Sequence, residues 1–242
     1  VVVPSAWRPG KVLVDQMLPP EEFVVLVAED QVADYRAAQP HLRYDVFPGT
    51  EHPSKWDWAL EKYGSVMWVD DDFDRMYHFE HAAGDGICRL TPQETIDLFR
   101  RTAWEAAQVG AYLFCYGDNL KNYNDLHPFR LTGFVPGGVF GMLAGSGLWW
   151  HEDCGTAGDY WLSALNAYMH RVIWVDGRYG PAGPKQLTFK NPGGAARLRT
   201  IEGEKRDYLL LKRYFGDAIQ PKQPTVRAKL THEYQRRLVV PF

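Results

Sequence analysis

The sequence predicts an α/β protein with a mostly parallel sheet flanked by helices. In its first half, short apolar runs rich in β-branched residues alternate with segments of helical periodicity. Polar and charged residues directly follow two of these runs, at the positions where such sheets bind ligands. The 242 residues, 45% of them hydrophobic and 14% aromatic, are enough for a sizeable core. No internal repeat appears, so we expect one domain, residues 1–184, with a basic C-terminal segment, residues 185–242.

The individual elements follow from periodicity and from the residues that end each run. The predicted strands are apolar runs at residues 1–3, 23–28, 42–47, 65–69, 111–116 and 171–176, with one more, interrupted by a glycine turn, within 131–143. Helices are predicted at residues 30–38, 53–63, 92–108, 159–167 and 205–215. Thr91 and Glu94 have the spacing of a capping box, which predicts where the third helix begins.

Three consecutive aspartates, Asp70, Asp71 and Asp72, follow the predicted strand at residues 65–69. Carboxylates a few ångströms apart repel one another and raise one another's pKa, unless a cation lies between them. A divalent metal carrying a diphosphate would meet this need, because hard cations bind carboxylate and phosphate oxygens together. In an extended segment Asp70 and Asp72 would both face one site. A solvated acidic turn, or carboxylates that begin a following helix, would explain the triplet equally well.

Further candidate residues lie in three other segments. Ser5 and Arg8 follow the first strand, where a polar turn can hold a nucleotide, although a simple surface arginine is the plainer interpretation. Asp153 and Asp159 lie in an acidic stretch that leads into a helix, so either carboxylate could act as a general base toward an acceptor hydroxyl or merely cap the helix. His232 could supply a late metal ligand or be an ordinary surface histidine.

The charge is unevenly distributed although the net charge is only −3. Residues 1–184 hold 14 Lys/Arg against 25 Asp/Glu, whereas residues 185–242 hold 13 Lys/Arg against 5 Asp/Glu. A basic segment on an acidic body suggests a polyanionic partner such as nucleic acid. The same cations would alternatively neutralise acidic groups of this protein or bind the phosphates of a small ligand.

Cysteine usage and hydropathy indicate the compartment. Cys88, Cys115 and Cys154 are odd in number and widely spaced, which favours reduced thiols over a disulfide framework or a metal finger. No apolar run approaches the roughly 18 residues of a membrane span, and residues 1–4 lack the basic region of a signal peptide. We therefore expect a cytoplasmic protein with no membrane partner.

In their order along the chain, these features resemble a known family. Ser5 and Arg8 come first, and the strand at 23–28 with Glu29 follows. The strand at 66–69 comes next, with its aspartates and Phe73. An acidic motif then begins a helix, and the strand at 171–176 follows that helix. Over residues 1–180 the chain resembles nucleotide-sugar-dependent glycosyltransferases of the GT-A type, whose fold is Rossmann-like. It is similar in particular to the bacteriophage glycosyltransferases associated with TET-type dioxygenases, which modify 5-hydroxymethylcytosine in DNA.

The resemblance implies a role for each candidate residue. Ser5, Arg8, Asp70 and Asp71 would form the site of the nucleotide sugar, a UDP-sugar. Asp70 would lie near the ribose or the metal, and Asp72 would hold Mn²⁺ or Mg²⁺ against the diphosphate in the manner of a DXD motif. Asp159, or else Asp153, would be the acceptor-side carboxylate; Gly158 precedes Asp159 where the family's commonest motif has an acidic residue, and the adjacent acidic pair here is Glu152–Asp153.

These expectations combine into one hypothesis. The protein would be an enzyme, a metal-dependent glycosyltransferase of the hexosyltransferase type, acting on 5-hydroxymethylcytosine in double-stranded DNA inside a phage-infected bacterial host. The basic segment would contact the DNA backbone, with Arg197, Arg199 and Arg206 as candidates. The alternatives are a glycosyltransferase acting on a glycan or protein, a nucleotidyltransferase, and a non-catalytic nucleic-acid-binding protein. The sequence leaves open which sugar is transferred and with which stereochemistry.

Overall fold

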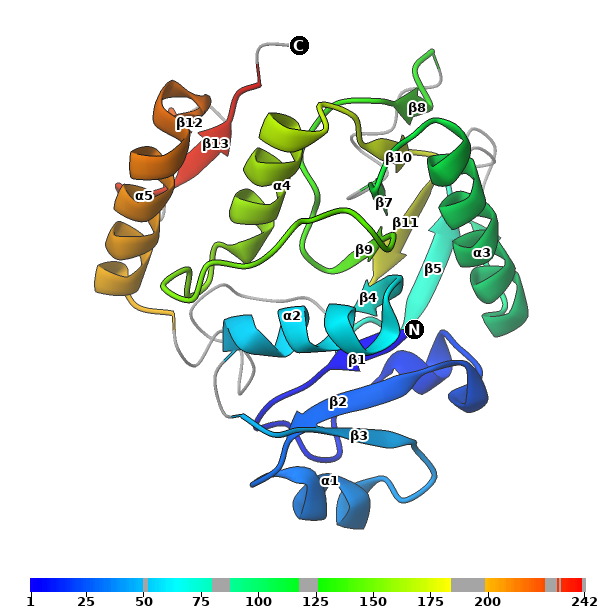
Figure 1. Cartoon of the computed structure of the whole chain (residues 1–242). Helices are drawn as coiled ribbons and strands as arrows, with labels where there is room; N and C mark the ends of the chain where they lie inside the picture. Colours follow the sequence, from blue (N-terminus) through cyan, green and yellow to red (C-terminus); the bar gives the residue numbers. More distant parts are fainter. Residues whose placement is uncertain are drawn as a thin grey trace.

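The computed structural model describes residues 1–49, 52–79, 88–117, 126–183, 199–224, 230 and 232–240, with the backbone alone at 52–54. Within these residues the main sheet has eight strands in the order β3-β2-β1-β4-β9-β7-β10-β8 (Figure 1). In chain order these are β1 (Val2–Pro4), β2 (Val24–Ala28), β3 (Tyr44–Phe47), β4 (Val66–Val69), β7 (Leu113–Tyr116), β8 (Phe129–Arg130), β9 (Val139–Met142) and β10 (Trp174–Asp176).

The sheet is mostly parallel. Strands β3, β2, β1 and β4 run in one direction, and β7 and β10 share it. Strand β9 runs antiparallel between β4 and β7, and β8 is antiparallel at one edge. The predicted fold class, an α/β protein with a mostly parallel sheet flanked by helices, is confirmed.

Helices cover both faces of the sheet. They are α1 (Val32–Ala38), α2 (His52–Tyr63), α3 (Pro92–Gln108), α4 (Gly158–Met169) and α5 (Ile201–Phe215). Successive strand residues point to opposite faces. Trp68 of β4 therefore packs in one hydrophobic cluster with residues of α2 and α4, such as Trp161. Its neighbour Met67 packs in a second cluster with Tyr35 of α1 and Phe99 of α3.

Helix starts follow from their capping residues. The capping box of α3 is confirmed: the Glu94 amide donates to Thr91 Oγ1 over 3.3 Å, and the Thr91 amide donates to Glu94 Oε2 over 2.7 Å. Helix α5 begins four residues before the predicted position 205, because Thr200 is its N-cap and accepts a hydrogen bond from the Gly203 amide at 3.0 Å. Its first turn therefore contains Glu204, which the sequence analysis placed before the helix.

Five short strands outside the main sheet were not predicted, and neither was the edge strand β8 within it. β5 (Arg75–His78), β6 (Cys88–Arg89) and β11 (Tyr179–Ala182) form a three-stranded sheet, and β12 (Ile219–Pro221) pairs with β13 (Arg236–Leu238). Each has two to four residues with little hydrophobic alternation, so tertiary pairing rather than local pattern defines it.

The described part of the C-terminal segment packs against the rest of the fold. Leu211 of α5 and Ile219 of β12 belong to the same hydrophobic cluster as Trp161 of α4. Figure 1 shows α5, β12 and β13 beside α4 at one end of the molecule. The division at residues 184 and 185 lies outside the described residues and stays a prediction.

Two further expectations concern membranes and thiols. In the part of the chain that the structure describes, no helix is both long and apolar enough to cross a membrane. Cys88 is exposed, Cys115 and Cys154 are buried, and all three are free thiols.

Gly141 of β9 lies where the sheet leaves no room for a side chain, because a Cβ there would come within 1.9 Å of the Phe114 ring. We predict that Gly141→Ala lowers the free energy of unfolding by about 1–3 kcal/mol through overpacking, as measured by urea denaturation. Adding Phe114→Leu should recover part of this loss, since a smaller side chain would make room for the methyl group. Additive losses in the double variant would contradict this explanation.

Candidate functional site

The three aspartates form a turn between β4 and β5. The Phe73 amide donates to the Asp70 carbonyl over 3.3 Å, and the Asp70 amide donates to the carbonyl of Gly138, just before β9, over 2.8 Å. The expected extended segment is thus wrong, and so is a helix that begins at the triplet, because β5 follows. The turn lies at the carboxyl end of β4, the edge at which ligands of parallel sheets bind.

The turn after β1 meets this triplet through a chain of hydrogen bonds. The Arg8 amide donates to the Tyr35 hydroxyl over 2.9 Å, and the Tyr35 hydroxyl lies 2.7 Å from Ser5 Oγ. Ser5 Oγ in turn donates to Asp71 Oδ2. The two segments that the sequence analysis singled out separately, Ser5–Arg8 and the triplet, are therefore in direct contact, with Tyr35 of α1 between them.

A single guanidinium group joins two of the three carboxylates. Arg8 Nη1 lies 2.8 Å from Asp71 Oδ1 and 2.8 Å from Asp72 Oδ2, and the Arg8 side chain is only 11% exposed. Burial raises the pKa of Asp71 to about 6, against the opposing effects of Arg8 and Ser5. Burial also raises the pKa of Asp70 well above its ordinary value, and the charges of Asp72 and Asp71 add to this. The single charge of Arg8 thus cannot neutralise all three clustered carboxylates.

A buried lysine lies under the same turn and was missed by the sequence analysis. Lys55 of α2 is 4% exposed, and its Nζ donates to the Ser5 carbonyl over 3.2 Å. Burial lowers its pKa to about 8, although the charges of Asp71 and Asp30 raise it. Nothing in the amphipathic pattern around α2 distinguishes this lysine from a solvent-facing one, so only the fold reveals it.

The residues of the turn fit a cation. Asp72 Oδ1 is buried and has no hydrogen-bond partner among the described residues, and ionised Asp70 needs a positive charge nearby. Carboxylate oxygens are what hard divalent cations prefer. Within the described residues, however, no three His, Cys, Asp or Glu side chains converge as a ready metal site. A metal here would take its remaining ligands from a diphosphate and water.

Asp159 lies beside the triplet, at the start of α4. Its charge is one of those that raise the pKa of Asp70. A methyl group at Gly137, next to the residue that anchors Asp70, would come within 3.3 Å of Asp159 Cβ. Burial raises the pKa of Asp159 to about 6, against a hydrogen bond from the Tyr160 amide and the charges of Arg236 and Arg199. Asp159 is thus ionised at neutral pH yet basic enough to accept a proton.

Asp153 is placed differently. Its side chain is 69% exposed, and its amide donates to His151 Nδ1 over 3.1 Å. The structure brings Asp159, and not Asp153, to the triplet.

A buried aspartate that the sequence analysis missed holds the loop before α4. Asp207 of α5 is fully buried and accepts hydrogen bonds from the Gly155 amide at 3.0 Å and the Thr156 amide at 2.8 Å. Thr156 Oγ1 also donates to Asp207 Oδ2 over 3.1 Å. Helix α5 thereby fixes the position from which α4, and with it Asp159, begins. The sequence offered no signal for this, because 50 residues separate the partners.

His232 lies on the far side of Asp159. Both line one polar pocket of about 220 Å³, together with Thr156, Tyr160, Arg199, Glu204, Lys222, Gln235 and Arg236. Burial lowers the pKa of His232, so its imidazole is neutral at pH 7. Its role as a metal ligand stays a prediction.

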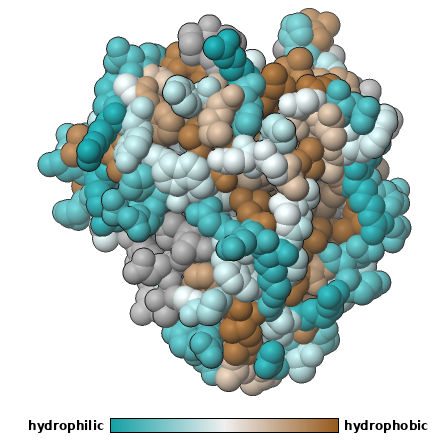
Figure 2. All heavy atoms as spheres, in the orientation of Figure 1, coloured by the Kyte–Doolittle hydropathy of each residue, from teal (hydrophilic) through white to brown (hydrophobic). Residues whose placement is uncertain are grey.

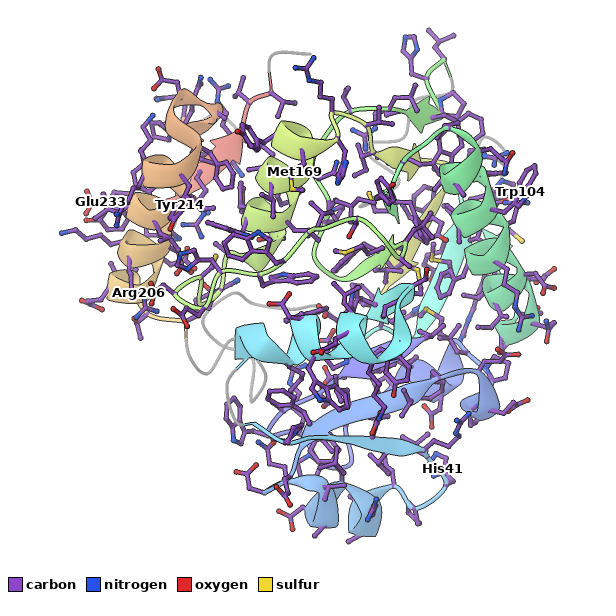
Figure 3. All side chains as sticks on the ribbon, in the orientation of Figure 1. His41, Trp104, Met169, Arg206, Tyr214 and Glu233 are labelled. Carbon is purple, nitrogen blue, oxygen red and sulfur yellow. The ribbon has the colours of Figure 1, made fainter. Side chains whose placement is uncertain are left out.

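The arginines expected to contact DNA and two neighbouring tryptophans lie in different environments. Arg206 lies exposed in the first half of α5, as Figure 3 shows, and Arg197 lies outside the described residues. Trp150 is buried and stacks on Trp56 with ring centroids 5.4 Å apart, whereas Trp149 is 43% exposed. Of the two tryptophans, only Trp149 is available to stack on a ligand.

Comparison with known proteins gives limited information. No protein-family model matches the chain, and no curated protein matches it. Among solved structures, the crystal structure of S. aureus TarS, residues 1–349, is similar at 11% sequence identity with a TM-score of 0.43, over 88% of this chain and 70% of that one. The chemistry of this chain therefore has to be inferred from its own residues.

We predict that Asp71→Asn changes how stability depends on pH. The folded state holds the pKa of Asp71 at about 6, above its ordinary 3.8, so ionisation of Asp71 costs stability as the pH rises from about 4 to about 6. Two pKa units correspond to about 3 kcal/mol. Relative to wild type, the variant should gain up to about that free energy of unfolding between pH 4 and pH 7 in urea denaturation.

Asp45→Asn serves as a control of opposite sign. Burial acts to raise the pKa of Asp45, but hydrogen bonds from Lys62 and Tyr63 outweigh it and lower the pKa. This variant should lose stability relative to wild type as the pH rises from below the lowered pKa of Asp45 to just above 3.8, and the difference should stay constant at higher pH. The same sign for both variants would refute the assignment of Asp71 as a buried, unfavourably ionised group.

Proposed function

We propose that this protein transfers a sugar from a nucleoside diphosphate sugar, a UDP-sugar, to a hydroxyl group. The observation that carries the proposal is the shortage of positive charge at the carboxyl end of β4. Asp71 and Asp72 share the guanidinium of Arg8, Asp70 has no ion pair among the described residues, and a buried oxygen of Asp72 has no hydrogen-bond partner there. A cation bound to a diphosphate would relieve this imbalance.

Each residue has a part in the proposal. Ser5, Arg8 and Asp71 would hold the nucleotide side of the donor. Asp70 and Asp72 would hold Mn²⁺ or Mg²⁺, which when bound would act as a Lewis acid on the departing diphosphate. Asp159, whose pKa is about 6, would accept the proton of the acceptor hydroxyl.

The acceptor that we propose is the hydroxymethyl group of 5-hydroxymethylcytosine in double-stranded DNA. The support is the charge of residues 185–242, where 13 Lys/Arg face 5 Asp/Glu. Several of these cations are exposed on α5 and after it, such as Lys205, Arg206 and Arg213. Figure 2 shows hydrophilic side chains over α5 on the side facing the viewer. Such cations bind phosphates without reading sequence.

A thermal-shift assay with UDP and Mn²⁺ tests the donor site. At one hundred times the dissociation constant, a ligand of the native state adds about 2.7 kcal/mol, which for a chain of this size raises Tm by roughly 5–10 °C. Asp72→Asn should abolish the part of the shift that depends on Mn²⁺. Asp34→Asn, an exposed change on α1, should keep it. A wild-type protein that does not respond to any nucleotide with Mn²⁺ would exclude the proposed donor site.

The same variants test the chemical step when the protein is incubated with nucleotide sugars and hydroxymethylated DNA. Mass spectrometry of the nucleosides should then show the transferred sugar. Asp159→Asn should retain the thermal shift with UDP but lose transfer by about 100-fold or more, because it removes only the general base. Release of pyrophosphate, without sugar transfer, would indicate a nucleotidyltransferase instead.

We also predict that Arg206→Glu combined with Arg213→Glu weakens binding to duplex DNA by roughly ten-fold or more at 0.15 M salt and lowers its salt dependence. Donor hydrolysis should be unchanged, because both side chains are exposed on α5. The control is Arg36→Glu with Arg130→Glu, two exposed arginines outside the basic segment. Equal weakening in the control would show that net charge, and not this segment, governs DNA binding.

A further inference from the structure

The polar pocket beside Asp159 has features of a separate ligand-binding site. It has a volume of about 220 Å³ and lies between the start of α4, the start of α5 and the β12–β13 pair. The residues that matter for its charge are Asp159, Arg199, Glu204, Lys222, His232 and Arg236. The sequence analysis singled out Asp159, Arg199 and His232 separately and did not bring them together in one pocket.

Two arginines in this pocket share one carboxylate. Arg236 is almost fully buried; its Nη2 donates to Glu204 Oε2 over 2.9 Å and its Nη1 to the Glu204 carbonyl over 3.2 Å. Arg199 Nε lies 3.3 Å from Glu204 Oε1, and its Nη2 donates to the Thr156 carbonyl over 3.3 Å. The Nε atoms of both arginines are buried and donate no hydrogen bond within the described residues.

The lining of the pocket therefore has more positively than negatively charged side chains. Lys222 adds a third cation and forms no ion pair with a described residue. Three cations face the carboxylates of Glu204 and Asp159. A phosphate suits the partly exposed Arg199 and the exposed Lys222, because its oxygens accept charge-assisted hydrogen bonds and match the planar fork of arginine.

The pocket also borders Asp159, which interacts with Asp70 of the acidic turn. The charge of Asp159 raises the pKa of Asp70, and Arg236 and Arg199 lower that of Asp159. Asp159 is thus between the acidic turn, where we place the donor, and the basic pocket. An anion in this pocket would belong to the molecule that approaches Asp159 from the side opposite the donor.

We propose that this pocket is a phosphate subsite for the acceptor, which holds a phosphodiester beside Asp159 so that a hydroxyl on the same molecule reaches that carboxylate. The proposal deepens the proposed function and rests on it for the identity of the acceptor. Arg199 and Lys222 make the contacts with phosphate, while buried Arg236 holds Glu204 and the pocket floor. The acceptor class is accordingly a hydroxyl compound with a phosphodiester, and not a neutral glycan.

Two variants test the subsite in the full-length chain. Lys222→Gln and Arg199→Gln should each raise the KM for hydroxymethylated duplex DNA about ten-fold. In Lys222→Gln, transfer to the phosphate-free nucleoside 5-hydroxymethyldeoxycytidine and the KM for the donor should be unchanged. Arg36→Gln, with the same loss of charge on exposed α1, should leave all three values unchanged. A raised donor KM would instead assign the phosphate to the donor, and unchanged KM values in both variants would overturn the subsite.

A binding measurement separates failure of the subsite from failure of the proposed function. Inorganic phosphate should raise the Tm of the wild-type protein above that in sodium chloride of equal ionic strength. The double variant Arg199→Gln/Lys222→Gln should lose this shift, and Arg36→Gln should keep it. A phosphate shift that depends on these two residues, without any sugar transfer, would keep the pocket and reject the glycosyltransferase. Absence of the shift would reject the pocket whatever the reaction.

Discussion

The arrangement of the whole site depends on three carboxylates that share one guanidinium group at the end of a buried strand. Asp71 and Asp72 both contact Arg8 Nη1 at 2.8 Å, and Asp70 lies next to them with a strongly raised pKa. Such a cluster is unfavourable in an isolated protein, because desolvation and mutual repulsion both oppose ionisation. The fold anchors the turn on both sides, through Ser5 after β1, which is held by Tyr35 of α1, and through Gly138 before β9. The turn thus holds three carboxylates close together at the end of β4.

The antiparallel strand β9 explains how Asp159 comes to the same place. Because β9 runs against β4, its first residues lie at the end of β4 where the triplet begins. Gly137, at that point, leaves room for Asp159, and a side chain there would crowd it. Asp207 of α5 then fixes the loop that leads into α4 through two backbone amides and a hydroxyl. The acidic turn and Asp159 are thus held by separate elements that meet at one edge.

Residues of the C-terminal segment contribute to the folded core, which the charge of the segment did not indicate. Leu211 and Ile219 contribute to the hydrophobic cluster around Trp161, and Asp207 is buried among hydrogen bonds to the loop before α4. Some of its cations are exposed, whereas Arg199 and Arg236 converge on Glu204 in the pocket beside Asp159. Neutralisation of acidic groups within the protein therefore holds for Arg199 and Arg236, whereas an anionic partner for the exposed cations stays a proposal.

The sequence by itself determined the elements of the main sheet, except the edge strand β8, and the position of the triplet. Apolar runs with turn residues between them specify strands locally, and the capping box of Thr91 and Glu94 specifies where α3 begins. The sequence also placed Ser5 and Arg8 at the same kind of strand end as the triplet, whereas their direct contact was found only in the structure. Only the tertiary structure decided that Asp159 and not Asp153 lies at the site, that Lys55 and Asp207 are buried, and that five short strands form. Each of these features depends on partners that are distant in the sequence. The local sequence pattern does not show which distant residues will bury a given side chain.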